Sequence, residues 1–323
     1  MRVLGMVVLC LVVALAGCAG GGPKEFPSSR ITVICPPAPG GISDTLTRSL
    51  ASAAQEALDV PVTVINKPGA SGAIGLRAGA SAEPDGYTVT YVIVEVVILP
   101  HLGYEKIGYE NFDLLMRTNL SPAAVSVQKG DRRWKDLKSF IAYAKAHPGE
   151  VSVGNSGTGA IWHLAALALE KETGAKFNHV PYQGSGPAVQ DLMGKHIDAV
   201  MSGASEVQVG LDAGKVEMLA LLADDRSEYF PEVPTAKEQG VDVSIGAWGG
   251  LGVPKGTPDD ARAALLGGFK QAYDSEQFTK VMERRAISRA WLGAEDFTQF
   301  AREQQAYFGE LIEEFGIKPQ AAE

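Results

Sequence analysis

Four glycine-rich turns stand where short apolar runs of this chain end and helix-like patterns begin. Two lie in the first third of the sequence, at 37–44 and 66–72, and two in the middle, at 154–159 and 182–187. A turn of this kind lets backbone N–H groups at the start of a helix point outward with no side chain in the way, which suits an anionic group. Two pairs in two parts of the chain therefore predict two jaws that hold one small anion between them.

The third turn comes close to two catalytic patterns and fails both. The run from Gly154 to Thr158 nearly matches a nucleophile elbow around Ser156, but the elbow requires glycine where Thr158 stands. The same turn lacks the Lys-Ser/Thr pair of a phosphate-binding loop, because Ala160 and Ile161 follow its last glycine. A hydrolase that uses Ser156 is kept as an alternative function, and nucleotide hydrolysis is poorly supported.

The spacing of the histidines gives no support to metal chemistry. The five are scattered, with no paired spacing on one helix face. They are His101, His147, His163, His179 and His196. His163 lies one turn into the helix after the third glycine turn, where it either caps that turn or lines a cleft. No metal or cofactor is expected.

Two acidic residues lie close enough to the turns to matter for a ligand. Asp44, next to the candidate N-cap Ser43, suits the helix dipole as a first-turn acid and is equally well placed to touch a ligand. Glu95 ends the third apolar run and is flanked by valines, so it either faces a cleft or pairs with a basic residue or solvent. If it faces the cleft, a fully ionised tricarboxylate is repelled, and an amino acid or another ligand with a donor fits better.

The elements that must position these residues follow an α/β pattern. Apolar β-rich runs alternate with helix-period segments from 31 to about 253, which predicts mainly parallel sheets flanked by helices. Strands are expected at 31–35, 62–65, 88–94, 151–153, 177–180, 199–201 and 216–222, and helices at 43–58, 137–147, 161–173, 188–193 and 207–213. Ligands of such folds bind outside the carboxyl ends of the strands, where the four turns fall.

Two further extended runs, 124–128 and 248–253, are interpreted as crossovers between two lobes. The segment 258–315 has a helical pattern throughout, and its helices are expected to return to the sheet of the first lobe.

The amino terminus has the pattern of an export signal. Arg2 is followed by the apolar stretch 3–16, which is too short to span a bilayer, and by a small-residue site. Leu15-Ala16-Gly17-Cys18 resembles the bacterial lipobox, in which the cysteine carries a lipid; the alternative is an ordinary signal peptide with an accidental cysteine. The glycine-rich residues 19–23 predict a flexible tether. We expect a lipid-anchored protein of the periplasm or cell envelope that touches the membrane only through this lipid.

Composition limits the partners. The 323 residues are 46% hydrophobic, which argues against a disordered chain, and their net charge of −9 comes with no basic tract, which argues against nucleic acid. Cys10 leaves with the signal and Cys18 would carry the lipid, so Cys35 is the one free thiol and no intramolecular disulfide is expected. Because Cys35 lies in an apolar run, it is predicted to be a buried small hydrophobe.

The motifs, in their order and spacing, resemble the substrate-binding proteins of tripartite tricarboxylate transporters, also called the TctC-like or Bug family of periplasmic receptors. The resemblance runs through nearly the whole mature chain. It is carried by Pro39-Gly40-Gly41 with Asp44 and Arg48, Asn66 to Ala70, Pro84 to Thr88, Gly154 to Gly159 with His163-Leu164-Ala165, His179 to Tyr182 with Gly184, Gly186-Pro187-Ala188, and Pro231 with Val233-Pro234-Thr235 and Glu238. The sequence departs from the family after the third strand, where Glu95 replaces a small hydroxyl residue and Leu99 precedes Pro100 in place of asparagine.

This resemblance implies a two-lobed α/β periplasmic binding protein of the Venus flytrap type (type II), with two crossover strands and mainly parallel sheets flanked by helices. It implies a signal peptide at 1–17, a tether at 18–26, a first lobe of 27–125 plus 250–323, and a second lobe of 126–249. It also implies a monomeric receptor rather than an enzyme. The ligand would be a small organic acid (a di- or tricarboxylate, an aromatic acid or an amino acid), delivered to integral membrane transporter subunits; a ligand-binding sensor subunit is a further alternative.

In this family a carboxylate is held largely by backbone N–H groups and hydroxyls of the glycine turns. Together with Glu95 and His163 from the reasoning above, the positions that match define the candidate site. The candidate ligand-binding residues are Gly40, Gly41, Ser43, Asp44, Gly69, Ala70, Ser71, Glu95, Ser156, Gly157, Thr158, Gly159, His163, Tyr182, Gly184 and Ser185, and the candidate lipidation site is Cys18.

The lipobox interpretation predicts the effect of one substitution. Cys18→Ser removes the thiol that would carry the lipid, so the protein is expected to move from the membrane fraction to the soluble fraction of fractionated cells. Cys10→Ser, which leaves the lipobox intact, is the matched control. A Cys18→Ser protein that stays with the membrane would contradict the anchor.

Overall fold

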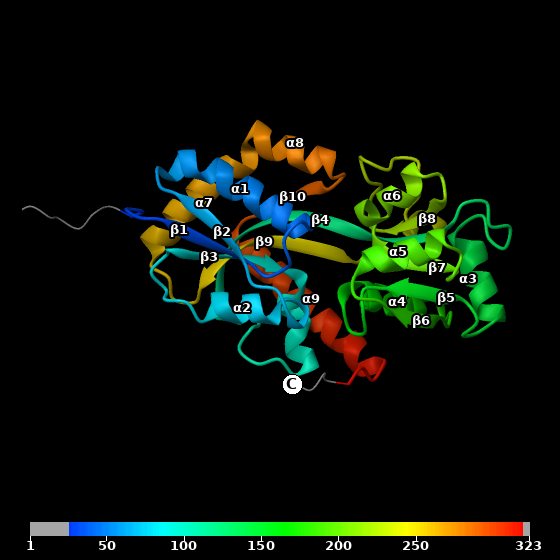
Figure 1. Ribbon diagram of the computed structural model, residues 1–323. Helices are drawn as coiled ribbons and strands as arrows, with labels where there is room; N and C mark the ends of the chain where they lie inside the picture. Colours follow the sequence, from blue (N-terminus) through cyan, green and yellow to red (C-terminus); the bar gives the residue numbers. More distant parts are fainter. Residues whose placement is uncertain (1–25, 319–323) are drawn as a thin grey trace, which may run out of the picture.

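The computed structural model describes residues 26–318, which form two lobes joined by two long strands (Figure 1). The predicted signal peptide, Cys18 and the tether up to residue 25 lie outside the described residues. Phe26 already packs on the first lobe, with its ring centroid 5.0 Å from that of Tyr87. No helix among residues 26–318 combines the length and the apolar character needed to cross a bilayer.

The first lobe is built on three parallel strands in the order β2-β1-β3. These are β1 (Ile31–Cys35), β2 (Val62–Asn66) and β3 (Thr88–Ile93). Helices α1 (Ile42–Leu58), α7 (Asp259–Asp274) and α8 (Glu276–Arg284) lie on one face of this sheet, and α2 (Ala73–Ala80) lies on the other (Figure 1). Cys35 is buried and free, as predicted, and burial raises the pKa of its thiol to about 11.

The second lobe repeats the plan with parallel strands in the order β6-β5-β7. Its strands are β5 (Ser152–Asn155), β6 (Asn178–Pro181), β7 (Ala199–Gly203) and β8 (Val216–Leu222), and its helices are α3 (Leu137–Ala146), α4 (Ile161–Thr173), α5 (Ser185–Met193) and α6 (Gln208–Asp212). Short 3-10 turns lie at Ala70–Gly72, Val94–Val97, Leu99–Leu102, Tyr109–Asn111, Ala204–Val207 and Lys237–Gln239.

Two antiparallel strands, β4 (Phe112–Gln128) and β9 (Gly246–Pro254), run from one lobe to the other. The first part of β4 pairs with β9 from Phe112 to Pro122, and its second part pairs with β7 and β8 from Ala123 onward. One strand therefore belongs to both sheets, which fixes how the lobes face each other. The two predicted crossover runs fall inside these strands, whereas the lobe boundaries at 125/126 and 249/250 stay a prediction.

The sequence pattern was wrong about part of the carboxyl-terminal segment, which is not helical throughout. Strand β10 (Ser288–Leu292) interrupts it and pairs antiparallel with β4. Its five residues are all half-buried and show no alternation, so no strand pattern is visible in the sequence. Pairing with β4 gives this short segment the hydrogen bonds that its own sequence does not predict.

The last helix, α9 (Ala294–Glu314), passes beneath the crossover strands and reaches the second lobe (Figure 1). It packs on β4 and also on α4, and Lys171 of α4 pairs with Glu314 at 2.7 Å. The expectation that the final helices only cover the first sheet is therefore incomplete, because α9 forms a third connection between the lobes.

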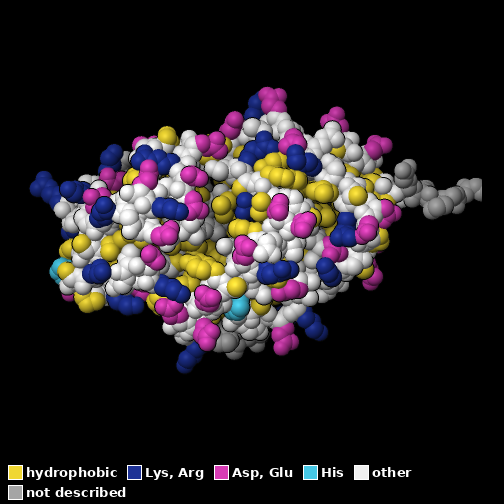
Figure 2. All heavy atoms as spheres, turned by 180° about the vertical axis from the view of Figure 1, so that it is seen from behind, with side chains coloured by type: hydrophobic (Ala, Val, Ile, Leu, Met, Phe, Trp, Pro, Cys, Tyr) yellow, Lys and Arg dark blue, Asp and Glu magenta, His cyan; other side chains and the backbone are white. Residues whose placement is uncertain are grey.

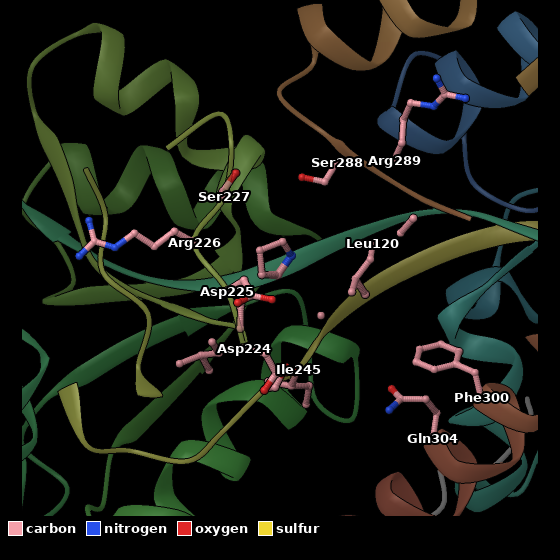
Figure 3. A pocket seen from close by; sticks show the side chains of 16 residues that line it. Leu120, Asp224, Asp225, Arg226, Ser227, Ile245, Ser288, Arg289, Phe300 and Gln304 are labelled. Atoms are coloured by element: carbon pink, nitrogen blue, oxygen red, sulfur yellow. The ribbon is translucent and has the colours of Figure 1, made fainter. Parts of the chain in front are cut away.

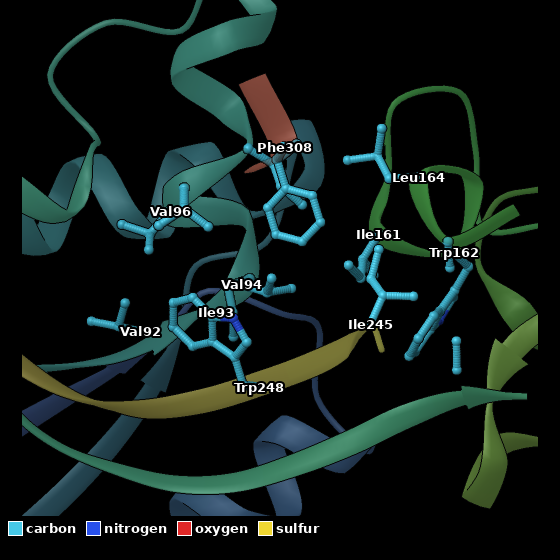
Figure 4. Close-up of a cluster of buried hydrophobic side chains, with 14 of the residues drawn as sticks. Val92, Ile93, Val94, Val96, Ile161, Trp162, Leu164, Ile245, Trp248 and Phe308 are labelled. Carbon is cyan, nitrogen blue, oxygen red and sulfur yellow. The ribbon is translucent and has the colours of Figure 1, made fainter. Parts of the chain in front are cut away.

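Apolar packing is continuous through the junction of the lobes. Figure 4 shows Val94, Phe308 and Trp248 on one side of this junction and Ile161 and Trp162 on the other. In the second lobe, alternate residues of β4 enter different clusters: Ala123 and Val125 pack with α3 and α4, while Ala124 packs with α5. The period of two places helices on both faces of the sheet. On the outside, basic and acidic side chains are interspersed over the face seen in Figure 2.

The close pairing of the crossover strands depends on a residue without a side chain. A Cβ atom at Gly250 would lie 2.4 Å from the carbonyl oxygen of Met116 and 2.6 Å from the ring of Phe297. We expect Gly250→Ala to lower the free energy of unfolding by about 1–3 kcal/mol, because the backbone neighbour cannot rotate away. Gly267→Ala, at an open position of α7, is the control and is expected to raise it by roughly 0.5–1 kcal/mol. Urea unfolding measures both, and equal effects of the two substitutions would contradict the packing argument.

Candidate functional site

The four predicted glycine turns lead into four helices that share one feature. Helices α1, α2, α4 and α5 begin after N-cap positions that make no side-chain capping hydrogen bond. The same is true of α6, α7 and α9, whereas Asp136 caps α3 and Ser275 caps α8. The N-cap residues of the first four helices are Gly41, Gly72, Ala160 and Gly184. First-turn N–H groups have no partner within their own helix, so these starts are suited to an external acceptor.

The starts of these helices meet at a cavity of about 500 Å³ between the lobes. The lining comes from both lobes and from β9. It consists of Pro36, Pro37, Ala38, Ser43, Pro68, Gly69, Ser71, Gly72, Ile93, Val94, Glu95, Ser156, Ala160, Ile161, Trp162, Gln183, Gly184, Glu206, Ala247 and Trp248. The strands β1, β2, β3, β5, β6 and β7 all present the segments after their carboxyl ends here, as expected for an α/β fold.

Six of the predicted ligand-binding residues line this cavity. They are Ser43, Gly69, Ser71, Glu95, Ser156 and Gly184, and at least one comes from each glycine turn. The other ten do not line it in this structure: Gly40, Gly41, Asp44, Ala70, Gly157, Thr158, Gly159, His163, Tyr182 and Ser185. Several of the ten hold the turns in shape, and direct ligand contact by any of the sixteen stays a prediction.

Asp44 supports the first turn from behind. Its carboxylate accepts a hydrogen bond from the Gly40 N–H at 2.9 Å and bonds from the side chains of Arg48 and Asn66. Burial raises the pKa of this carboxyl, but these hydrogen bonds outweigh burial and hold it below its usual value. Of the two roles considered for Asp44, these contacts agree with the structural one.

His163 has the same supporting role in the third turn. Its Nδ1 accepts a hydrogen bond from the Gly159 N–H at 3.1 Å, and its ring meets that of His179 edge-on with centroids 4.8 Å apart. Burial, together with the neighbouring His179, lowers the pKa of His163 to about 4. Because Nδ1 is engaged by Gly159, this nitrogen is not available as a base for Ser156.

Two carboxylates approach the cavity from opposite lobes. Glu95 follows β3 in the first lobe, and Glu206 follows β7 in the second; both are half-buried. Burial, with the charge of Glu206, raises the pKa of Glu95 to about 7. Burial also raises the pKa of Glu206, against hydrogen bonds from Gly203, Ser185 and Trp162 that lower it.

Two hydrogen-bond donors in the lining have no partner in the described part of the chain. They are the Trp248 indole N–H, on a residue only 2% exposed, and the Ser156 hydroxyl. Buried donors without a partner are rare in native structures and call for an explanation. Both donor atoms are shielded from solvent in this structure, so an acceptor on a ligand would pair with them only if it reached past the cavity surface.

Sequence reasoning missed Glu206, Trp162 and Trp248. Glu206 had a usable signal, because it lies three residues after a parallel strand and so at the same sheet edge as the third and fourth turns. The tryptophans had none, since Trp162 lies within an apolar helix and Trp248 within a crossover strand.

A second cavity, of about 330 Å³, is shown in Figure 3. Side chains from 224–227 face Ser288 and Arg289 of β10 and Phe300 of α9 across it. None of the four glycine turns reaches this cavity, and Arg289 is already bonded to the carbonyl of Tyr273 at 2.7 Å. The first cavity is therefore the candidate binding site.

Two α/β lobes hinged on a pair of strands, with helix N-termini converging between them, define a solute-binding protein. The model of the tripartite tricarboxylate transporter family receptor matches residues 46–317, and this chain belongs to that family. A protein encoded in the gbd 5′ region of Cupriavidus necator is 32% identical over 91% of this chain and 89% of its own length. Protein BugT of Bordetella pertussis is 30% identical over 97% of this chain and 98% of its own length.

Solved structures of similar proteins support the same family and fold. A TctC solute-binding protein from Polaromonas, determined without ligand, superposes with a TM-score of 0.80 at 37% identity and covers 90% of this chain and 100% of its own. MatC from Rhodopseudomonas palustris with bound malate gives 0.74 at 26% identity over 89% of this chain and 100% of its own. Another Rhodopseudomonas palustris protein, with adipate, gives 0.79 at 25% identity over 92% of this chain and 100% of its own. The predicted family and fold class are confirmed.

The buried His163 predicts a pH dependence of stability. A histidine whose pKa is about 4 when folded and 6.5 when unfolded binds fewer protons in the folded state. Its contribution is therefore fully present above pH 6.5 and is lost as the pH falls towards 4, by up to about 3 kcal/mol. His163→Gln is expected to lose correspondingly less stability over this range in urea unfolding than the parent chain does. His196→Gln, at an exposed position, serves as the control, and parallel curves for the parent and His163→Gln would contradict the prediction.

Proposed function

We propose that this protein is an extracytoplasmic receptor that captures a small organic carboxylate between its lobes and delivers it to the membrane subunits of a tripartite transporter. The observation that carries the proposal is the convergence of four helix starts, without side-chain caps, on one cavity. Partial positive charge at such starts favours a carboxylate, and the unpartnered donors of Ser156 and Trp248 add to it.

The relatives support the same ligand class. MatC holds malate and the Rhodopseudomonas palustris protein holds adipate, and both share this fold at TM-scores of 0.74 and 0.79. Malate and adipate are small organic acids.

Magnitudes are consistent with reversible capture and lobe closure. Four charge-assisted hydrogen bonds of roughly 1.5–3 kcal/mol each contribute about 6–12 kcal/mol. Association and ordering cost at least about 4 kcal/mol, so contacts to one lobe alone give weak binding. Only a closed state lets both lobes contact the ligand, and binding then shifts the population towards closure.

The remaining parts of the proposal rest on the sequence of the amino terminus and on the family to which the chain belongs. The protein is proposed to be exported, anchored through a lipid on Cys18, monomeric, and without enzymatic activity. In the described residues the Ser156 hydroxyl has no hydrogen-bonded base, so no observation favours the alternative of a hydrolase.

Two substitutions test carboxylate capture. Ser156→Ala and Trp248→Phe each remove one unpartnered donor from a residue of the cavity lining and are expected to weaken binding of the best acid by roughly 10- to 100-fold, since each donor would serve a charged acceptor. Isothermal calorimetry with dicarboxylates, tricarboxylates, aromatic acids and amino acids gives the affinities.

The chain offers matched controls for both variants. Ser49 and Trp134 also carry buried donors without a partner in the described residues, but neither lines the cavity. Ser49→Ala and Trp134→Phe are therefore expected to leave the affinity unchanged. Absence of binding to every carboxylate in the panel by the folded parent protein would overturn the proposed function.

A further inference from the structure

Both donors and acceptors line the cavity. The donors are the first-turn N–H groups of four helices, the Ser156 hydroxyl and the Trp248 indole N–H. The acceptors are Glu95 and Glu206, one from each lobe, and Glu206 lies beside the start of α5, whose Ser185 hydroxyl bonds to it. These two glutamates are the only charged side chains among the described residues that line the cavity.

Neither glutamate is neutralised by a cation in residues 26–318. No lysine, arginine or histidine lines the cavity, and the ion pairs of the described chain involve other acids. Oε2 of Glu206 accepts bonds from the Gly203 N–H at 2.8 Å and the Ser185 hydroxyl at 2.9 Å, and the Trp162 side chain also donates to this carboxylate. Glu95 makes no side-chain bond to another described residue. Two half-buried carboxylates that face each other's charge without a cation are unfavourable in the empty state.

The buried Trp248 is the second, independent observation. Its indole N–H belongs to a side chain only 2% exposed, lines the same cavity and has no partner in the described chain. An indole N–H is a donor only, so it calls for an acceptor on the ligand. Glu95 and Glu206, referred to below as the acid pair, are acceptors that a hydrogen-bond donor or a cation would stabilise. A ligand that satisfies both the donors and the acceptors of the lining carries a carboxylate and a protonated amine.

We infer that the ligand of this receptor is an amino acid, whose ammonium group lies between Glu95 and Glu206 while its carboxylate lies at the helix starts and the Trp248 N–H. This inference rests on the proposed function and narrows it to zwitterionic acids. It assigns the two glutamates as selectivity residues, one contributed by each lobe. Because the ammonium bridges the lobes, it also favours the closed state.

Two other ligands could lie beside the acid pair, a divalent cation or a dicarboxylate, and the experiment below distinguishes each of them from an amino acid. A divalent cation would need more ligands than this pair offers, and the described residues contain no group of three or more His, Cys, Asp or Glu placed to hold a metal. A fully ionised dicarboxylate would meet the glutamates with like charge and would bind only with uptake of a proton.

Whether ligand binding releases protons or takes them up distinguishes an amino acid from a dicarboxylate. Burial, with the charge of Glu206, raises the pKa of Glu95 to about 7, so near neutral pH the empty pair holds part of one proton. An ammonium group between the glutamates favours their charged forms, and binding releases protons. A dicarboxylate disfavours those charged forms, and binding takes protons up.

The experiment compares matched ligand pairs by isothermal calorimetry in two buffers of different ionisation enthalpy at pH 7. The pairs are aspartate with succinate, leucine with 4-methylpentanoate, and phenylalanine with 3-phenylpropionate. In at least one pair the amino acid is expected to bind roughly 10- to 100-fold more tightly than its partner, as charge-assisted bonds to the ammonium imply. Its binding is expected to release protons.

Two isosteric variants assign the effect to the acid pair. Glu95→Gln and Glu206→Gln are each expected to lower the affinity for the amino acid by at least about 10-fold. Each is also expected to reduce proton release, since burial still raises the pKa of the remaining glutamate, while affinity for the amine-free partner stays equal or rises. Glu56→Gln, at an exposed position of α1, is the matched control. Circular dichroism and the unfolding midpoint establish that each variant is folded before affinities are compared.

The outcomes separate this inference from the proposed function. Equal or tighter binding of the amine-free acids by the parent chain would overturn the inference and leave the carboxylate receptor in place. Binding of Mg²⁺ or Ca²⁺ that Glu95→Gln abolishes would overturn it in favour of a metal site. Absence of binding to all six acids, with the protein folded, would overturn the inference and count against the proposed function as well.

Discussion

The first turn of an α-helix carries backbone N–H groups that the helix itself cannot satisfy, and in this protein four such turns open on the same cavity. Side chains meet this need at the starts of α3 and α8, through Asp136 and Ser275, whereas α6, α7 and α9 also begin without a side-chain cap but do not open on this cavity. At the cavity, glycine or alanine stands at the N-cap, and no capping side chain fills the space. The binding site is therefore a set of backbone groups left open by small residues.

This arrangement requires that the two lobes face each other across the cavity. Strand β4 joins both sheets, and β9 pairs with it across the junction. Glycines at 249 and 250 let Tyr91 and the backbone of β4 approach β9 closely. Helix α9 adds a third link through the ion pair of Lys171 with Glu314. The carboxyl ends of six parallel strands then bring their turns to one place.

Much of the site was predictable because its main components are local in sequence. Glycine turns after apolar runs marked all four places where these helices begin, although no helix was expected over α2 (Ala73–Ala80) and α5 begins three residues before the expected 188–193. Glu95 was singled out for its place at a strand end. Long-range pairing was not predictable from pattern. Strand β4 begins at Phe112 rather than near 124, because Asp113 is satisfied by Lys255 at 2.7 Å and Asn119 by Tyr91, residues distant in sequence. Strand β10 likewise depends on β4 as its neighbour.

The supporting residues show a second limit of sequence reasoning. For Asp44 and His163 the sequence left a structural role and a ligand contact open, and in the structure both bond to the turns and do not line the cavity. The residues of the cavity wall that complete its charge pattern, Glu206 and Trp248, come from other elements. Which side chains share a wall is set by tertiary packing, and a single sequence carries little record of it.

Hydrogen exchange of the backbone amides, followed by mass spectrometry with and without the tightest-binding acid, tests the central claim most directly. The account predicts that saturation slows exchange at the first turns of α1, α2, α4 and α5 together, in both lobes, while the capped starts of α3 and α8 are unchanged. Protection confined to one lobe, or located at the second cavity beside β10, would contradict it.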